Sequence, residues 1–272
     1  MSKRYGVLAA AGLVLLAALP AKADKLDDII NSGKLRCAVT LDFPPMGSRD
    51  ASNNPIGFDV DTCNDLAKAL GVKAEVVETP FPARIPALLS GRADVGVASV
   101  SNTLERAKTI GFTNPYFAFK FSVLARKGSG ITDYNSQKGH AVGSTAGTYE
   151  AIALEGDVKK WADSKGSFHP YQSQADVFLA LSQGQIDATD VTSTVAAAIV
   201  QSGKYPNLEI VGEAPYATDY VCMIALRNEQ GLLNYLNLFI GHQVREGRYQ
   251  ELYKKWVGAG SVPDLTIPGV YE

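Results

Sequence analysis

The segment Asp94–Arg106 reads Asp-Val-Gly-Val-Ala-Ser-Val-Ser-Asn-Thr-Leu-Glu-Arg. Its first half alternates valine with small residues, and this alternation predicts a short buried β-strand. We expect the strand to stop at small polar residues, and a single arginine follows. Because ligands of open α/β sheets bind beyond the carboxyl ends of strands, the segment predicts an α/β fold and places a binding site at this corner.

The corner after this strand has the groups that bind a carboxylate. Ser99 and Ser101 contribute hydroxyls, and the end of the strand frees backbone N–H groups. Arg106 adds a planar guanidinium whose paired donors match the two oxygens of a carboxylate. The alternative is an ordinary strand-to-helix turn, capped by Thr103, with an arginine on the surface.

Two runs of alternating strands and helices fill most of the chain. The first is expected to have strands at Leu35–Thr40, Ala74–Glu78 and Ala93–Ala98 and helices at Val60–Leu70 and Ile85–Ser90. The second is expected to have strands at 139–144, Ser167–Tyr171 and Ala188–Val191 and helices at 150–164 and Gln174–Gln183. This alternation predicts two α/β lobes, each a mostly parallel sheet flanked by helices.

Two extended segments are expected to cross between the lobes. They are Phe117–Arg126 and Tyr220–Leu226, and helices at 229–247 and 249–257 then complete the first lobe. Lobe one is thus predicted to comprise 24–117 plus 221–272, and lobe two 118–220. Two sheets joined by two crossings leave a cleft, which is where we expect a ligand.

Several short motifs follow one another along the chain in the order that one protein family has. They include residues 57–61 (Gly-Phe-Asp-Val-Asp), 84–94 (Arg-Ile-Pro-Ala-Leu-Leu-Ser-Gly-Arg-Ala-Asp) and 110–116 (Ile-Gly-Phe-Thr-Asn-Pro-Tyr). Together with residues 94–106 they resemble the polar-amino-acid family of bacterial solute-binding proteins, the periplasmic receptors of ATP-driven (ABC) importers. The resemblance covers about Leu26 to Val257 and implies a two-lobed type II periplasmic-binding-protein fold with two hinge crossings.

The resemblance also implies which residues contact the ligand. Phe43 would lie against the bound solute, and Phe81 takes the place of a residue that contacts the ligand's side chain. Both rings stand on proline-rich loops, which hold the backbone stiffly. Packing in the core is the alternative role for either ring.

The carboxylate of the ligand is assigned to both lobes. By the resemblance Arg106 holds the α-carboxylate through two parallel hydrogen bonds, with Ser99 and Ser101 beside it. Thr148, in the turn Ala-Gly-Thr-Tyr-Glu at 146–150, would meet the same carboxylate from lobe two. Capping of the following helix is the alternative for Thr148, and the two roles are compatible.

The chain departs from the family where the ligand's ammonium group is usually neutralised. An aspartate of the family stands near the position of Thr192, and a threonine cannot balance a charge. An unpaired ammonium in a closed cleft would cost several kcal/mol. Asp190, on the same face of the expected strand, and Asp219, near the return crossing, are the candidate replacements. Otherwise the ligand is a carboxylate that is not a standard α-amino acid.

Two other functions are alternatives, an enzyme and a sensory module. The same fold houses a periplasmic cyclohexadienyl dehydratase, and Glu150 stands where that enzyme class carries its general acid. Many receptors have a glutamate there as well, because an acid in the first turn complements the helix dipole. A sensory module of a larger receptor would need a spanning or signalling segment, and we do not expect one. We therefore expect a binding protein that is not an enzyme.

Cofactors and metals are not expected either. The histidines, His140, His169 and His242, are scattered without the spacing of metal ligands, and no phosphate loop or hydrolase motif occurs. The identity of the ligand stays open, because its side chain is selected by loop residues whose orientation the sequence does not give.

The N-terminus predicts export to the periplasm. Lys3 and Arg4 precede an apolar run from Gly6 to Leu19, and Ala21-Lys22-Ala23 matches the cleavage site of a signal peptide. The run is too short to span a bilayer, which needs about 20 residues. We therefore expect residues 1–23 to be removed.

The mature chain would carry 23 basic and 28 acidic residues, a net charge of −5. That balance argues against nucleic acid or an anionic membrane surface as a partner. The expected partners are a small-molecule ligand and the permease of an ABC importer, bound by a monomer. Cys37, Cys63 and Cys222 are odd in number, so at least one is unpaired or pairs between chains. A bridge between Cys37 and Cys63 is conceivable in an oxidising compartment.

Overall fold

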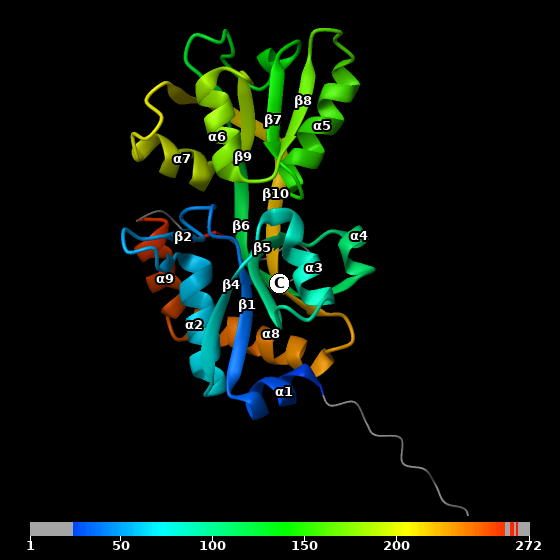
Figure 1. Cartoon of the computed structure of the whole chain (residues 1–272), viewed down its shortest axis with the longest axis vertical. Coiled ribbons are helices and arrows are strands. Elements are labelled where there is room, and N and C mark those ends of the chain that lie inside the picture. Colours follow the sequence, from blue (N-terminus) through cyan, green and yellow to red (C-terminus); the bar gives the residue numbers. More distant parts are fainter. Residues whose placement is uncertain (1–23, 259–261, 264, 266–272) are drawn as a thin grey trace, which may run out of the picture.

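The computed structural model describes residues 24–258, 262, 263 and 265 of the 272-residue chain. The predicted signal peptide, residues 1–23, lies outside the described residues. Within them, no helix is long and apolar enough to cross a membrane. The chain forms two lobes stacked along its longest axis, and two long strands connect them (Figure 1).

The two connecting strands are β6 (Ile110–Arg126) and β10 (Leu208–Leu226), which contain the predicted crossings. They pair antiparallel along most of their length, and the pairing is irregular between Ala214 and Asp219. On one side of this irregularity β10 pairs with a strand of lobe one, and on the other β6 pairs with a strand of lobe two. The irregularity therefore lies at the passage between the lobes, where we expect bending.

Lobe one is a sheet with helices packed around it. Its elements are α1 (Lys25–Ser32), β1 (Lys34–Val39), β2 (Ser48–Arg49), β3 (Pro55–Ile56), α2 (Phe58–Leu70), β4 (Lys73–Glu78), η1 (Phe81–Ala83), α3 (Arg84–Leu89), β5 (Val95–Ser101), α4 (Leu104–Ala107), α8 (Gln230–Arg245) and α9 (Arg248–Trp256). The strand order is β4-β1-β5 followed by β10 and β6, and β1 is parallel to both of its neighbours.

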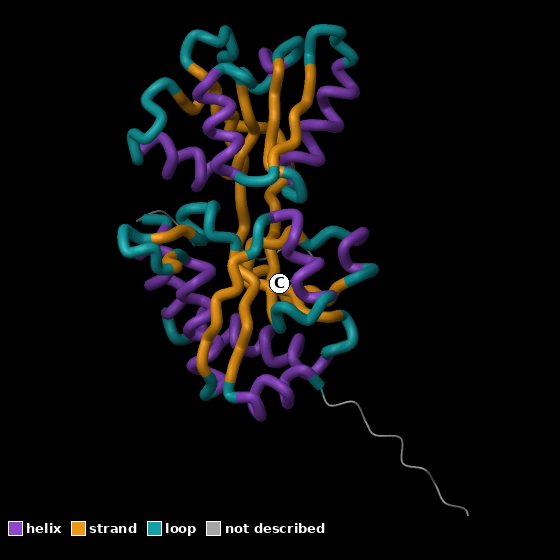
Figure 2. The backbone as a smooth tube through the Cα atoms, in the orientation of Figure 1, coloured by secondary structure: helices purple, strands orange, loops and turns teal. Residues whose placement is uncertain are grey.

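Lobe two repeats the arrangement beyond the crossing (Figure 2). Its elements are η2 (Asn135–Gln137), β7 (Ala141–Thr145), α5 (Tyr149–Trp161), β8 (Ser167–Tyr171), α6 (Gln174–Gln183), β9 (Ala188–Thr192) and α7 (Ser193–Gln201). The order is β10-β6-β9-β7-β8, with β7 parallel to β8 and β9. Among the described strands of the large sheet, only the hinge strands β6 and β10 form antiparallel pairs, and β2 and β3 make a separate antiparallel pair, so the prediction of mostly parallel sheets is confirmed.

Several predicted boundaries were wrong by a few residues. Strand β5 does not stop at Ala98 but continues to Ser101, because Val100 and Ser101 find backbone partners in β10. Helix α5 ends at Trp161 rather than at residue 164, since Ala162 adopts a left-handed conformation with φ of 48°. Helices α1 and α7 were not predicted. The extension of β5 brings Ser99 and Ser101 into the sheet itself, at its end in the cleft.

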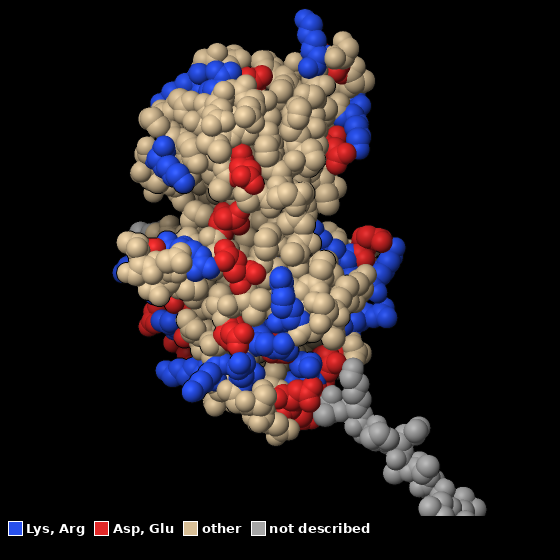
Figure 3. Space-filling view, in the orientation of Figure 1, with Lys and Arg blue, Asp and Glu red and all other residues tan. Residues whose placement is uncertain are grey.

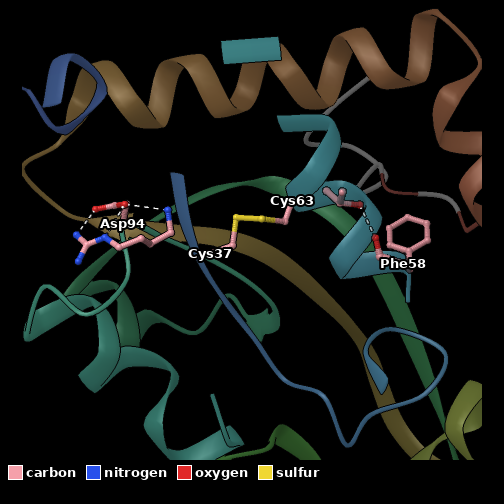
Figure 4. Close-up of a disulfide and its surroundings, with 6 residues drawn as sticks. Cys37, Phe58, Cys63 and Asp94 are labelled. Carbon is pink, nitrogen blue, oxygen red and sulfur yellow. Dashed lines mark hydrogen bonds and ion pairs between the residues drawn. A yellow bond between two sulfur atoms is a disulfide. The ribbon is translucent and has the colours of Figure 1, made fainter. Parts of the chain in front are cut away.

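Lobe one is also held by a covalent bond. Cys37 of β1 and Cys63 of α2 form a disulfide between strand and helix (Figure 4). Both cysteines are fully buried, as is the free Cys222. Beyond the bridge, Arg36 of β1 forms an ion pair with Asp94, with 2.6 Å between Nη2 and Oδ1. The disulfide joins β1 to α2, and the ion pair joins β1 to the residue that precedes β5.

Candidate ligand-binding site

A cavity lies between the two lobes, where the molecule narrows to a waist (Figure 3). Its free volume is only about 10 Å³, so the two lobes lie almost closed on one another here. The lining residues come from strand ends, loops and one helix start: Phe43, Phe81, Arg84, Ser99, Ser101, Phe119, Thr148, Tyr149, Glu150, Thr192 and Asp219. A wider groove on lobe one, between α2, α8 and α9, is formed by that lobe alone. We take the cavity as the candidate site because both lobes meet there and three buried charged residues, Arg84, Glu150 and Asp219, line it.

Aromatic rings form one wall of the cavity. The rings of Phe43 and Phe81 pack edge to face with 5.0 Å between centroids, and Phe119 of β6 lies 5.8 Å from Phe43. All three side chains are buried. The structure therefore brings Phe43 and Phe81 together at the predicted place and adds Phe119, which the sequence did not single out.

Arg84 is the largest addition to the predicted site. It is the first residue of α3, only 3 % exposed, and its guanidinium lies 4.6 Å from the centre of the Phe81 ring. Its Nη1 donates to the carbonyl oxygens of Ala98 and Ser99, both at 2.8 Å. Burial lowers the pKa of Arg84 to about 9. The group thus fixes the end of β5 and also faces the cavity.

Arg106 lies beside the cavity, and its hydrogen bonds cross to lobe two. Its Nη1 donates to the carbonyl of Ser101 at 3.2 Å, and its Nη2 donates to the carbonyl of Gly147 at 2.8 Å. Nη2 of Arg84 donates to the same Gly147 carbonyl, also at 2.8 Å. Two guanidinium groups of lobe one therefore converge on a single neutral oxygen of lobe two.

Two carboxylates face the same cavity. Asp219 of β10 accepts a hydrogen bond from Ser101 Oγ at 2.9 Å, and burial raises its pKa to about 6. Glu150, in the first turn of α5, is 3 % exposed, and burial raises its pKa to about 7. Among the described residues, neither acid forms an ion pair with Arg84 or Arg106. One cation and two anions thus line the cavity, and Arg106 lies beside it, without direct pairing between them.

The predicted hydroxyl groups are present, but most already have partners. Ser99 Oγ donates to Asp59 at 3.3 Å, and the Tyr116 hydroxyl donates to the same carboxylate at 2.7 Å. Thr148 Oγ1 donates to a carbonyl of the preceding turn and accepts from the backbone N–H of Ala151, so it caps α5. Ser99, Ser101 and Thr148 all line the cavity, and the hydrogen bond from Ser101 positions Asp219, one of its charged groups.

The placement of Asp190 is a correction. Thr192 lines the cavity, but Asp190 is fully buried inside lobe two. Its carboxylate accepts hydrogen bonds from the Tyr216 hydroxyl at 2.6 Å and from Gln137 Nε2 at 3.0 Å. Two residues along a strand amount to roughly 6.6 Å, which carries Asp190 away from the strand's end in the cleft and into the lobe. Only Asp219 of the two candidate acids reaches the cavity.

Other residues of the site were missed or assigned differently. Arg84 and Tyr149 were not singled out, and Glu150 was considered only as the acid of an enzyme. Applying the strand-end rule to the loop after β4 would have included Arg84. Among the described residues, no group of histidine, cysteine and acidic side chains is arranged to hold a metal ion.

Known proteins resemble the chain over most of its length. The family model of bacterial extracellular solute-binding proteins, family 3, matches residues 35–259. The chain is 29 % identical over 246 residues to a glutamine-binding protein of an ABC transporter from Bacillus subtilis, which covers 89 % of this chain and 87 % of that protein.

Two solved structures share the fold. An ancestral arginine-binding protein bound to arginine has a TM-score of 0.76 and 32 % identity, covering 83 % of this chain and 99 % of that one. An ancestral amino acid-binding protein, described as a precursor of cyclohexadienyl dehydratase, has a TM-score of 0.76 and 28 % identity, covering 85 % and 99 %. The fold is thus that of type II periplasmic binding proteins. The match over residues 35–259 shows that the chain belongs to family 3 of the bacterial extracellular solute-binding proteins.

Proposed function

We propose that this protein binds an amino acid or a related small carboxylate between its lobes and delivers it to the permease of an ABC importer. The observation that carries the proposal is the convergence of Arg84 and Arg106 on the Gly147 carbonyl. Hydrogen bonds from a cation to a carboxylate are roughly twice as strong as those between neutral groups. A ligand carboxylate would therefore be a better partner for these guanidinium groups than the Gly147 oxygen.

Closure of the lobes would complete the site. Lobe one supplies Arg84 and the aromatic wall, and lobe two supplies Thr148, Glu150 and Thr192. At the edge of the cleft, Asp42 of lobe one accepts a hydrogen bond from the backbone N–H of Gln174, at the start of α6, with 2.7 Å between the atoms. An acid at a helix N-terminus is favoured by the helix dipole. This contact would help hold the lobes together once a ligand is bound.

The proposal includes the setting in which the protein works. We infer that it is exported, loses residues 1–23, and acts as a monomer in the periplasm. The relatives named above are binding proteins by name, so the proposal is binding and transport without catalysis. Separate closed and open forms would let the permease distinguish loaded protein from free protein.

A thermal-shift screen of the mature chain tests this function. The probes are the common L-amino acids and small mono- and dicarboxylates, with neutral sugars as controls. A ligand at 100 times its Kd stabilises the folded protein by about 2.7 kcal/mol, which is measurable as a higher Tm. We expect a carboxylate-bearing compound to raise the Tm and to reduce the radius of gyration in X-ray scattering. Stabilisation by sugars alone, or by no probe, would contradict the proposal.

A further inference from the structure

The inference concerns the two acids of the cavity and deepens the proposed function. Glu150 and Asp219 are both buried, with 3 % and 9 % of their surfaces exposed, and both side chains line the cavity. Glu150 comes from lobe two, whereas Asp219 lies on β10 next to lobe one, where Ser101 holds its carboxylate. The acids therefore approach the cavity from different elements.

Other buried acids of the chain lie outside the cavity and are held by side chains of distant elements. Asp190 accepts from Tyr216 and Gln137, and Asp94 is paired with Arg36. Asp59 accepts from Tyr116 and Ser99. No described side chain forms an ion pair with Glu150, and its nearest cations, Arg84 and Arg106, already donate to carbonyls. The donors to Glu150 are local, its own backbone N–H and the Thr148 hydroxyl, and burying a carboxylate without a paired cation is costly. Glu150 therefore lines the cavity as a buried acid for which the cation of a ligand would be the ion-pair partner.

We propose that Glu150 and Asp219 together bind the protonated amine of the ligand, so that the site selects amino acids over carboxylates that lack the amine. This assignment rests on the proposed function, in which Arg106 and Arg84 bind the carboxylate. It would replace the single aspartate expected near Thr192 with two acids on different elements. Because the amine contacts both α5 and β10, it is fully bound only when the lobes are closed.

Charge balance supports the same ligand. Arg84 in the cavity, Arg106 beside it and the two carboxylates together sum to zero charge, and a zwitterionic amino acid also carries no net charge. Closing on an amino acid therefore buries as many cations as anions. A carboxylate without an amine would leave the enclosed site with an excess negative charge, which is expensive away from water.

The test compares ligands that differ only at the amine. The probes are L-amino acids and the α-hydroxy acids with the same side chain: alanine and lactate, leucine and its hydroxy acid, phenylalanine and phenyllactate, glutamate and 2-hydroxyglutarate. Calorimetry on the unaltered protein measures both members of each pair. We expect at least one amino acid to bind, and its hydroxy acid to bind at least 100-fold more weakly. Equal binding within any pair that binds would overturn the inference.

Variants identify the residues responsible. Glu150→Gln and Asp219→Asn are each expected to weaken the amino acid about 10- to 100-fold while leaving the hydroxy acid unchanged or improved. The matched control is Asp190→Asn, which alters a buried acid of lobe two outside the cavity. Parent-like binding of the amino acid by both cavity variants would refute the assignment. The ligand pairs require no substitution, so they decide the matter even where a variant fails to fold.

The outcomes separate this inference from the proposed function. If hydroxy acids bind as well as amino acids, the carboxylate site stands and the amine site is wrong. If neither class binds, both proposals fail.

Discussion

Two buried acids of lobe two, Asp190 and Glu150, differ in what surrounds them. Burial raises the pKa of each carboxyl to about 7, and neither is exposed by more than 3 %. Asp190 accepts hydrogen bonds from a tyrosine and a glutamine inside the lobe, whereas Glu150 faces the cavity between the lobes. Burial and pKa alone therefore do not distinguish a structural acid from a binding acid. What distinguishes them is position, because Glu150 lines the cavity and Asp190 does not.

The arginines repeat this contrast, and their removal should have the largest effect. Arg106→Ala should weaken amino-acid binding by 100-fold or more, because truncating a buried charge partner costs on the order of 2–5 kcal/mol. Arg106→Lys should fail nearly as badly, since a single ammonium cannot reproduce the paired donors of a guanidinium. Titration calorimetry measures both variants.

The matched control is Arg126 of lobe two, which forms an ion pair with Asp187 at 2.9 Å. We expect Arg126→Ala to lower stability without changing affinity. Arg106→Ala should lower affinity without changing stability. Weakened binding in Arg126→Ala, or parent-like binding in Arg106→Ala, would show that the cavity is not the binding site.

The acids themselves should respond with opposite signs when no ligand is present. Asp190→Asn should destabilise the protein by about 1–3 kcal/mol, because the buried hydroxyl of Tyr216 loses its charged acceptor. Glu150→Gln should leave stability unchanged or raise it at pH 8, since it removes a buried charge that lacks a cationic partner. Urea unfolding at pH 8 measures both. A loss of similar size in Glu150→Gln would mean that this carboxylate is structural, like Asp190.

The comparison also shows what the sequence can and cannot predict. Alternating apolar residues indicated most of the strands and helices of both lobes, including helix α6 and strand β9 of lobe two, because these patterns are local. The same alternation correctly put Asp190 and Thr192 on one face of β9. It could not tell that only the end of that strand reaches the cavity, because this depends on how the two lobes meet.

Arg84 was missed for a related reason. It begins a short helix, a place where an arginine is ordinarily solvated, and only the folded structure buries it between Phe81, the end of β5 and lobe two. The sequence left undecided whether Cys37 and Cys63 are bridged for the same reason, since their pairing depends on the packing of α2 against β1. Local patterns predict elements, whereas contacts between distant elements complete the site.

A smaller effect is expected where lobe two reaches the arginines. Gly147 has φ of 82°, and a Cβ there would lie 3.2 Å from the Cα of Pro82 in lobe one. Gly147→Ala should therefore hinder closure and weaken binding about tenfold. The control is Gly203→Ala, which has φ of 65° but would meet no atom within 4 Å. Both variants pay a left-handed backbone cost of roughly 1–2 kcal/mol, so only Gly147→Ala should lose affinity. X-ray scattering with saturating amino acid should show that it stays more open than the control.

The smallest effect is the dependence of binding on pH, and it separates the two acids by titration. The charged and polar groups that interact with the Glu150 carboxyl are Arg84, Arg106, Asp219 and the Thr148 hydroxyl. Burial raises the pKa of Glu150 to about 7 and that of Asp219 to about 6, so both are largely neutral at pH 5 and cannot balance an ammonium group. Affinity for an amino acid should therefore rise several-fold between pH 5 and pH 8, as these carboxyls lose their protons.

The stability of the free protein should change in the other direction. Between the ordinary carboxyl pKa near 4.5 and the raised value near 7, the folded protein holds protons that the unfolded chain has released, so its stability falls as pH rises. The increase in Tm on adding an amino acid should consequently be larger at pH 8 than at pH 5. Glu150→Gln should flatten the pH dependence of the affinity, whereas Asp190→Asn should leave it intact, because Asp190 titrates away from the ligand. An affinity that is equal at pH 5 and pH 8 would contradict the binding of the amine by these carboxyls. A pH dependence that Asp190→Asn removes and Glu150→Gln preserves would reverse the roles given to these two acids.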